Sequence, residues 1–202
     1  MSDVALAALV LAAGGSRRLG QPKQLVRWRG RSLVRRAVDA VLALGASPAV
    51  CVLGSSAEAC LAELAGLPVS TVIHPDWQEG IGSSLRAGIA ALDALEPTWC
   101  GVLILPCDLP RVDASSLRRL AEAARSRPEL ALVASSFAGT VGAPAIFPER
   151  FATELRALSG DRGARALLER HAGELVTVEM PEAAADVDDT GDLRELLGRT
   201  PR

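Results

Sequence analysis
The sequence has almost no excess of charge of either sign. Its 22 lysine and arginine residues oppose 24 aspartate and glutamate residues, which leaves a formal net charge of −2 over 202 residues. It contains no lysine-rich stripe of the kind that follows a phosphate backbone, so the composition predicts no nucleic-acid partner. Five arginines are nevertheless close together, and we interpret them as the solvated face of a helix: Arg27, Arg29, Arg31, Arg35 and Arg36.

The sequence also lacks the patterns of a disulfide-rich, zinc-binding or membrane-spanning protein. Its four cysteines form no C-x-x-C pair and have no histidine at ligand spacing, so we expect free thiols in a reducing cytoplasm. The first apolar run, at residues 5–13, is far shorter than a membrane span and follows no positively charged segment. We therefore expect neither a signal peptide nor a membrane partner. Histidine is scarce, with two residues, and no convincing Ser-His-Asp set accompanies them.

What the sequence does contain is an alternation of short apolar runs with amphipathic segments. Strands are predicted at residues 5–13, 49–53, 69–73, 101–105, 130–134, 143–147 and 175–178. Helices are predicted at residues 32–44, 57–64, 83–95, 115–125, 149–157, 162–171 and 192–197, with Asp113 as the N-cap of the fourth. This alternation indicates one α/β domain of Rossmann-like type, a three-layer sandwich around a mostly parallel central sheet. Ligands of such sheets bind at the carboxyl ends of the strands.

The first predicted strand ends in a glycine-rich loop that carries basic residues. Residues 11–23 read L-x-x-G-x-S-x-R-x-G-x-x-K. Gly14 and Gly15 allow a tight turn that brings backbone N–H groups close to an anion. Arg18 and Lys23 add positive charge, which transfer from a triphosphate needs because charge grows on the departing pyrophosphate. The loop has neither the G-K-S/T of a P-loop nor the G-x-G-x-x-G of a dinucleotide-binding loop, and a surface turn with chance arginines is the alternative.

A carboxylate follows the fourth predicted strand. Asp108 lies in the proline-framed segment P-C-D-L-P, at the expected carboxyl end of a central strand. Mg²⁺ takes one or two protein carboxylates and completes its octahedron with phosphate oxygens and water. Asp108 is therefore a candidate catalytic residue and metal ligand, with an ordinary turn aspartate as the alternative.

The junction between a loop and the third predicted helix has an unusual composition. Gly80 and Gly82 in the segment E-G-I-G-S-S-L permit close approach of the backbone to a ligand. Ser83 and Ser84 can cap the helix, and they can also offer hydroxyl groups to a planar ligand. Trp77, just before this segment, is interpreted as a packing residue.

Several motifs in this order resemble signatures of the superfamily of cytidylyltransferases and molybdopterin nucleotidyltransferases. Three of these motifs are the glycine-rich loop, P-C-D-L-P and E-G-I-G-S-S-L. The other three are G-A-P-A-I-F-P at 142–148, G-D-R-G-A-R at 160–165 and D-V-D-D-T-G-D at 186–192. The resemblance spans residues 11–193. It is similar to the molybdopterin cytidylyltransferase (MocA-like) branch of the MobA-like NTP transferase family, whose fold is that of nucleotide-diphospho-sugar transferases. Arg17 departs from the pattern, because a small polar residue is common there.

The resemblance implies a role for each matched residue. The catalytic residues would be Arg18, Lys23 and Asp108. The nucleotide would be bound by Leu11, Ala12, Ala13, Gly14, Gly15, Ser16, Arg18, Lys23, Gly80, Gly82, Ser83, Ser84 and Asp108. The acceptor would be bound by Gly142, Pro144, Gly160, Asp161 and Arg165, although Arg165 has the alternative of a helix-surface arginine. Asp188 would be the second metal ligand beside Asp108, and helix capping by Asp189 or Thr190 is the alternative for that segment.

The function that the resemblance implies is transfer of CMP from CTP to molybdopterin, with Mg²⁺ or Mn²⁺ and with release of pyrophosphate. The acceptor phosphate would attack the α-phosphorus directly, so no protein nucleophile is required. Residues 1–135 would form the nucleotide-binding half of the domain and residues 136–202 the acceptor-binding half. An apo-molybdenum hydroxylase would receive the product. Ala13 and residues 79–84 resemble the cytosine-using branch.

Three alternatives remain open from the sequence. The first is guanylyl transfer from GTP to molybdopterin. The second is cytidylyl transfer to a sugar or polyol phosphate such as methylerythritol phosphate. The third is a non-catalytic accessory protein that binds the molybdenum cofactor, against which the presence of Lys23, Asp108 and Asp188 argues.

Overall fold

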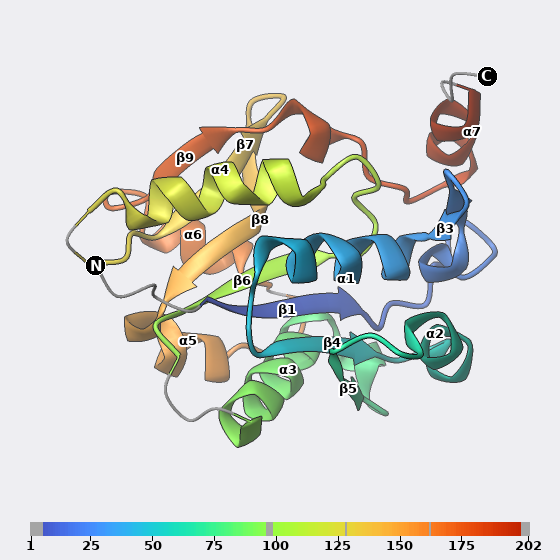
Figure 1. The fold of residues 1–202 in the computed structure, drawn as a ribbon, viewed down its shortest axis with the longest axis horizontal. Helices are drawn as coiled ribbons and strands as arrows, with labels where there is room; N and C mark the ends of the chain where they lie inside the picture. Colours follow the sequence, from blue (N-terminus) through green and yellow to red (C-terminus); the bar gives the residue numbers. More distant parts are fainter. Residues whose placement is uncertain (1–5, 96–98, 128, 162, 199–202) are drawn as a thin grey trace.

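A single seven-stranded sheet organises the chain, with helices on both faces (Figure 1). The computed structural model describes residues 6–95, 99–127, 129–161 and 163–198. The strands, in the spatial order β5-β4-β1-β6-β8-β7-β9, are β1 (Ala7–Ala12), β4 (Ala49–Leu53), β5 (Ser70–Ile73), β6 (Gly101–Pro106), β7 (Val133–Phe137), β8 (Thr140–Pro148) and β9 (Val176–Glu179). All neighbouring pairs are parallel except those that β8 makes. The predicted α/β sandwich is confirmed.

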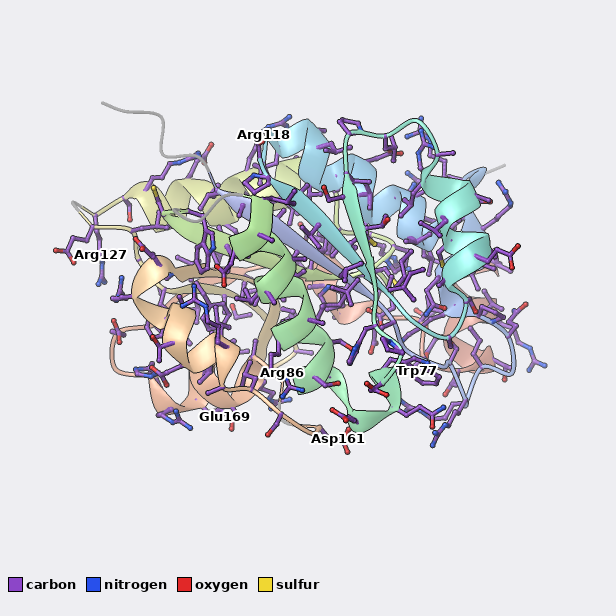
Figure 2. All side chains as sticks on the ribbon, turned by 90° about the horizontal axis from the view of Figure 1, so that it is seen from below. Trp77, Arg86, Arg118, Arg127, Asp161 and Glu169 are labelled. Carbon is purple, nitrogen blue, oxygen red and sulfur yellow. The ribbon has the colours of Figure 1, made fainter. Side chains whose placement is uncertain are left out.

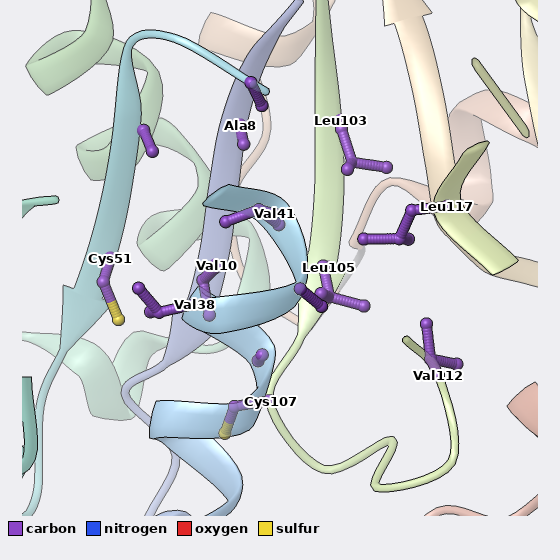
Figure 3. Close-up of a cluster of buried hydrophobic side chains, with 14 of the residues drawn as sticks. Ala8, Val10, Val38, Val41, Cys51, Leu103, Leu105, Cys107, Val112 and Leu117 are labelled. Carbon is purple, nitrogen blue, oxygen red and sulfur yellow. The ribbon is translucent and has the colours of Figure 1, made fainter. Parts of the chain in front are cut away.

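Helices cover both faces because successive side chains of a strand point to opposite sides of the sheet. The helices are α1 (Leu33–Leu44), α2 (Ala57–Leu64), α3 (Ile81–Leu95), α4 (Ala114–Arg125), α5 (Ala152–Arg156), α6 (Arg165–Arg170) and α7 (Thr190–Gly198). In β1, Val10 packs with α1 and α4 in one core, part of which is drawn in Figure 3. Its neighbour Leu9 packs with α3, α5 and α6 in the core of the other face. The continuous apolar run of β1 is therefore buried on both sides.

The second half of the sheet contains the antiparallel part of the predicted mostly parallel sheet. β8 pairs antiparallel with β6 on one side and with β7 on the other. A two-residue turn joins β7 to β8, and both of its residues, Ala138 and Gly139, have positive φ angles. This backbone conformation matches the twist of a tight hairpin, which only antiparallel strands can use. The predicted division near residue 135 falls within β7 and stays a prediction.

The interpretation of the arginine-rich segment as one helix face was wrong. Arg35 and Arg36 do lie on α1, but the preceding residues form a two-stranded hairpin of β2 (Arg27–Trp28) and β3 (Arg31–Ser32). Its turn residues, Arg29 and Gly30, both have positive φ angles. The guanidinium groups of Arg29 and Arg36 lie 4.5 and 4.4 Å from the centroid of the Trp28 ring, in cation–π contact.

A third, small core connects this hairpin to the end of the chain. It contains Leu19, Val26, Trp28, Leu33, Val187 and Leu196. Its members come from the loop after β1, the hairpin, α1 and α7, and Figure 1 shows α7 beside β3. Because Val187 is anchored there, the neighbouring Asp188 is held close to the loop after β1.

Several smaller expectations can be compared with the structure. Asp113 caps α4 as predicted, since its side chain accepts hydrogen bonds from the N–H groups of residues 115 and 116. The predicted helix at 149–157 consists of a 3-10 turn, η3 (Glu149–Phe151), followed by α5. Residue 5 of the first predicted strand and residue 162 of the sixth predicted helix lie outside the described residues.

The cysteines agree with the expectation of free thiols. All four cysteines are free, and Cys51, Cys60 and Cys107 are buried. Burial raises the pKa of Cys60 to about 11, which keeps its thiol protonated at neutral pH. Within the part of the chain that the structure describes, no helix has the length and apolar character needed to cross a membrane.

Candidate functional site
In the loop that follows β1, backbone carbonyl groups accept hydrogen bonds, whereas several backbone N–H groups have no partner among the described residues. Gln24 Nε2 lies 3.0 Å from the carbonyl oxygen of Ala12 and 2.6 Å from that of Gly14, and it donates to both. Ser55 donates its N–H to the Ala13 carbonyl (3.1 Å) and its hydroxyl to the Gly14 carbonyl (2.9 Å). The backbone N–H groups of residues 14–16 have no hydrogen-bond partner among the described residues. A run of unpaired N–H groups at the end of a strand is an anion-binding arrangement.

Lys23 lies between two carboxylates that are distant in the sequence. Its Nζ atom is 2.9 Å from Asp188 Oδ1 and also contacts Asp108 Oδ2. Arg18 Nη2 lies 2.7 Å from the other oxygen of Asp188. Asp108 follows β6 and Asp188 precedes α7, so only the fold brings them together. The structure thus unites four of the predicted catalytic and metal-binding side chains in one cluster.

The charges in this cluster shift the pKa values of its members. Burial acts to lower the pKa of Lys23, but Asp108 and Asp188 outweigh it and hold the pKa above its usual value. Burial acts to raise the pKa of Asp188, but Lys23 and then Arg18 outweigh it and hold the pKa below its usual value. Lys23 and Asp188 are therefore both charged at neutral pH.

Asp186, two residues before Asp188, has the opposite shift. Burial raises its pKa above the usual value, and the negative charges of Asp188 and Asp108 act in the same direction. A backbone hydrogen bond acts in the opposite direction but does not outweigh them, whereas at Asp188 two basic side chains outweigh burial.

The arrangement of Asp108 and Asp188 fits a divalent cation. Both carboxylates converge on one positively charged atom, Lys23 Nζ. The described residues contain no group of three or more His, Cys, Asp or Glu side chains that could hold an ion. The other ligands of such an ion would therefore be phosphate oxygens and water, which is the usual coordination of Mg²⁺.

The capping alternative for the segment 186–192 applies to Asp189, together with Asp192. Asp189 Oδ1 accepts hydrogen bonds from the N–H groups of Gly191 (2.6 Å) and Asp192 (3.0 Å), at the start of α7. Asp192 Oδ2 in turn accepts from the N–H groups of Asp188 and Asp189, each at 2.9 Å. These bonds form a reciprocal cap, which leaves the side chain of Asp188 free to face Lys23.

Trp77 packs against two glycines on either side of the loop. A Cβ atom on Gly15 would lie 2.6 Å from the Trp77 ring, and one on Gly54 would lie 2.8 Å from it. Both positions therefore exclude a side chain while Trp77 occupies this place. The packing role predicted for Trp77 is confirmed, but the same ring also lines a cavity.

We call that cavity the loop cavity. Its volume is about 380 Å³, and its charged lining residues are Arg17, Lys23, Asp108 and Asp161. Arg17 has no ion pair or hydrogen bond among the described residues, whereas Lys23 is already paired. Seven of the residues predicted to bind the nucleotide line it: Leu11, Ala13, Gly14, Lys23, Gly80, Ser84 and Asp108.

A second cavity of about 400 Å³, which we call the β8 cavity, adjoins the first. The two share Leu11, Ile81, Pro106 and Asp161 as lining residues. Figure 2 shows Asp161 and Trp77 on the same edge of the molecule, near the start of α3. The lining of the β8 cavity is largely apolar and comes from β8, α3 and α6, with Asp161, Arg165 and Asp186 as its charged residues.

Three of the five predicted acceptor residues line the β8 cavity, and two do not. Gly142, Asp161 and Arg165 line the β8 cavity, whereas Pro144 and Gly160 are not among its lining residues. Arg165 also pairs with Glu169 on its own helix, at 3.1 Å. Gly160 instead supplies the carbonyl oxygen that accepts from the Gly82 N–H at 2.9 Å.

Gly80 and Gly82 have a structural reason to lack side chains. A Cβ atom on Gly80 would lie 2.4 Å from the Gly160 carbonyl oxygen, and one on Gly82 would lie 2.8 Å from the backbone of Ser159. These glycines let the segment around residue 160 pack directly on the start of α3. Gly80 lines the loop cavity, whereas Gly82 is not among its lining residues.

Ser83 is turned away from the loop cavity. Its hydroxyl is 2.8 Å from the Gly80 carbonyl oxygen and 2.9 Å from His74 Nε2, and the side chain is buried.

The residues that sequence reasoning missed include Gln24, which is completely buried in the 3-10 turn η1 (Lys23–Leu25). A three-residue turn has too little periodicity to indicate which of its side chains faces inward.

Comparison with known proteins agrees with this geometry. Residues 8–175 match the MobA-like NTP transferase domain family. The chain belongs to that family. It is 31% identical over 201 residues to nicotine blue oxidoreductase of Paenarthrobacter nicotinovorans, which covers 94% of this chain and 95% of the relative.

Solved structures of relatives have the same fold. Rv0371c from Mycobacterium tuberculosis H37Rv superposes with a TM-score of 0.82 at 30% identity, covering 98% of this chain and all of the other. A complex of Rv0371c with manganese superposes with a TM-score of 0.76 at 28% identity, over 97% of this chain and 100% of that one. This MobA-like chain is therefore a nucleotidyltransferase by family, as its motifs predict.

Proposed function
We propose that this MobA-like transferase moves CMP from CTP to molybdopterin and releases pyrophosphate. The observation that carries the proposal is the position of the Lys23–Asp108–Asp188 cluster. Lys23 and Asp108 line the loop cavity. Leu11 and Pro106 line both the loop cavity and the β8 cavity, so they form a shared wall. A nucleotide in the first cavity and an acceptor in the second would thus meet beside the charged cluster.

Each part of the loop cavity has a role in this proposal. The unpaired N–H groups of residues 14–16, together with Arg18 and Lys23, would hold the triphosphate. Asp108 and Asp188 would hold Mg²⁺ or Mn²⁺, which when bound neutralises phosphate charge and polarises the reacting phosphoryl group. Gly80, Gly82 and Ser84 would lie along the base and ribose.

The acceptor phosphate would then attack the α-phosphorus of CTP in line with the departing pyrophosphate. The bond from the α-phosphorus to the bridging oxygen breaks, and pyrophosphate takes the electron pair. Lys23 keeps its proton throughout, since its neighbours raise its pKa, so it stabilises charge and does not act as a base. Positioning and electrostatics suffice for such a displacement.

The choice of CTP and molybdopterin is supported by sequence resemblance at Ala13 and residues 79–84. The β8 cavity would take the pterin body of the acceptor, with Gly142, Asp161 and Arg165 among its contacts. Pro144 and Gly160 would act indirectly, by shaping the strand and the loop. We further propose that the protein acts in the cytoplasm and passes its product to an apo-molybdenum hydroxylase.

A pyrophosphate-release assay with molybdopterin present, comparing CTP with GTP, tests the proposal. We expect pyrophosphate release with CTP and at least tenfold less with GTP. A preference for GTP would overturn the base assignment and favour guanylyl transfer. Turnover with methylerythritol phosphate instead of molybdopterin would overturn the acceptor assignment, and absence of turnover with every pair would favour the accessory role.

The similarity to nicotine blue oxidoreductase supports a second candidate, a redox reaction on a small organic acceptor. The largely apolar β8 cavity could accommodate such an acceptor. The two candidates differ in what they consume, because a redox reaction requires an electron donor and releases no pyrophosphate. Oxidation of a nicotinamide donor without any NTP would favour the second candidate.

A further inference from the structure
The side chain of Gln24 is the most deeply buried polar group next to the loop cavity. It has no exposed surface, although it neighbours Lys23, which is partly exposed. A buried amide of this kind must use its hydrogen-bonding groups within the protein, because an unpaired one is costly. Its side-chain partners among the described residues are Ala12, the last residue of β1, and Gly14 and Ser16 in the loop that follows.

The hydrogen bonds determine which way the amide group is oriented. Two backbone carbonyl oxygens, those of Ala12 and Gly14, lie within bonding distance of the same terminal atom. Carbonyl oxygens accept and cannot donate, so this atom must be the NH₂ nitrogen. The Gln24 carbonyl oxygen then faces the hydroxyl of Ser16 at 3.5 Å. Both amide hydrogens are thereby used on the loop.

This orientation determines the direction of the neighbouring backbone N–H groups. In a trans peptide unit, the C=O of one residue and the N–H of the next point in opposite directions. Because the Gly14 carbonyl points to Gln24, the Gly15 N–H points away from it. Because the Ala13 carbonyl accepts from the Ser55 N–H, the Gly14 N–H points away from Ser55. Gly14 also has open space around its Cα atom, where a Cβ would meet no neighbour.

We propose that Gln24 is a positioning residue that keeps the loop in its anion-binding form by occupying the Ala12 and Gly14 carbonyl groups. Without it, a peptide unit of the loop can rotate and present a carbonyl oxygen, which repels phosphate. This inference rests on the proposed binding of a triphosphate at the loop, and it is independent of which base or acceptor is used.

The test compares Gln24→Met with Gln21→Met by calorimetry. Methionine has a length similar to glutamine but donates no hydrogen bond, and Gln21 is an exposed residue of the same loop. The probes are inorganic tripolyphosphate, CTP and cytidine. We expect Gln24→Met to weaken tripolyphosphate and CTP binding by about tenfold or more, with cytidine binding unchanged. Gln21→Met should bind all three probes as the wild type does.

Each outcome has a distinct meaning. A folded Gln24→Met protein that binds tripolyphosphate as tightly as the wild type would overturn the positioning role and leave the proposed function intact. An equal loss for cytidine would also overturn it, since the defect would then not concern phosphate. A wild-type protein that binds neither CTP, GTP nor tripolyphosphate would overturn the proposed function itself, and the role of Gln24 with it.

A measurement on the wild-type chain covers the case in which Gln24→Met does not fold. In amide NMR spectra, tripolyphosphate should shift the proton signals of Gly14, Gly15 and Ser16 downfield, because these N–H groups would form new hydrogen bonds. The Leu19 and Gly20 amides, which already donate to the Ser16 carbonyl, should shift less. If none of the Gly14, Gly15 and Ser16 amide signals shifts downfield, the result would contradict the proposed backbone orientation.

Discussion
The loop cavity and the β8 cavity share a wall but are built in different ways. The loop cavity is formed by a short stretch of backbone whose carbonyl groups are held by Gln24 and Ser55, and by four charged side chains. The β8 cavity is formed largely by apolar side chains from strands and helices that pack from different parts of the chain. The first is therefore organised by hydrogen bonds and ion pairs, and the second by packing.

This difference determines how each cavity should respond to substitution. Hydrogen bonds and ion pairs are directional, so one altered group in the loop cavity should change the chemistry with little change in the fold. A packed apolar wall is sensitive to side-chain volume. A larger side chain in the β8 cavity should therefore block binding of the acceptor, while the charge interactions of the loop cavity persist. Four substitutions test this contrast, and they follow from the largest expected effect to the smallest.

Asp108→Ala should reduce pyrophosphate release by roughly a thousandfold or more, because it removes one of the two carboxylates that would hold the metal ion. The fold should persist, since Lys23 retains Asp188 as a partner at 2.9 Å. Steady-state pyrophosphate release and thermal unfolding measure the two effects. Asp76→Ala, at an exposed aspartate outside the cluster, is the matched control. Normal turnover in Asp108→Ala would refute the metal assignment.

Val141→Trp should raise the KM for the acceptor by about tenfold, because the larger side chain occupies part of the β8 cavity. The dissociation constant for CTP should stay within about twofold of the wild-type value, since Val141 does not line the loop cavity. Acceptor-dependent kinetics and CTP calorimetry separate the two. Thr177→Trp, at an exposed position of the edge strand β9, controls for the added ring. Equal losses for both ligands would show that the two cavities are not independent.

Arg17→Gln should weaken CTP binding about two- to fivefold, because an exposed cation contributes modestly to anion binding. The remaining affinity should also depend less on salt, since one screened interaction has been removed. Calorimetry at two salt concentrations measures both effects. Arg118→Gln, whose guanidinium contacts the Ala43 carbonyl on α1, should behave as the wild type. An unchanged affinity for CTP would mean that Arg17 does not face the triphosphate.

Asp188→Asn should lower the free energy of unfolding by less than about 1 kcal/mol at pH 7, because a third of the Asp188 side chain is exposed to solvent. The folded-state pKa of Asp188 lies below its unfolded value, so its contribution is present above the unfolded pKa of about 3.9. It is lost as the pH falls through the folded pKa. Denaturant unfolding of both proteins between pH 7 and 2.5 should show the difference vanishing at the acidic end; a difference that grows there would contradict this sign.

The charged side of the site could be predicted from the sequence to a large extent. Lys23 and Asp108 follow buried strands, and the carboxyl ends of those strands meet in any parallel sheet of this type. The prediction of Asp188 depended on resemblance, and the identity of the capping residue of α7, Asp189, required the hydrogen bonds of the structure. The β8 cavity was predicted through only some of its residues, because Ile81, Leu85 and Phe137 are indistinguishable from ordinary core residues in the sequence.

The sequence by itself determined the α/β class, the glycine-rich loop and most of the charged residues of the site. These follow from local patterns, since a buried strand, a tight turn and a helix cap are each encoded within a few residues. The tertiary structure decided that β8 runs antiparallel, that Ser83 faces His74 and that Gln24 holds the loop. These outcomes depend on contacts between distant segments, and a hydrogen bond or a packed wall can form only after the fold has brought both of its partners together.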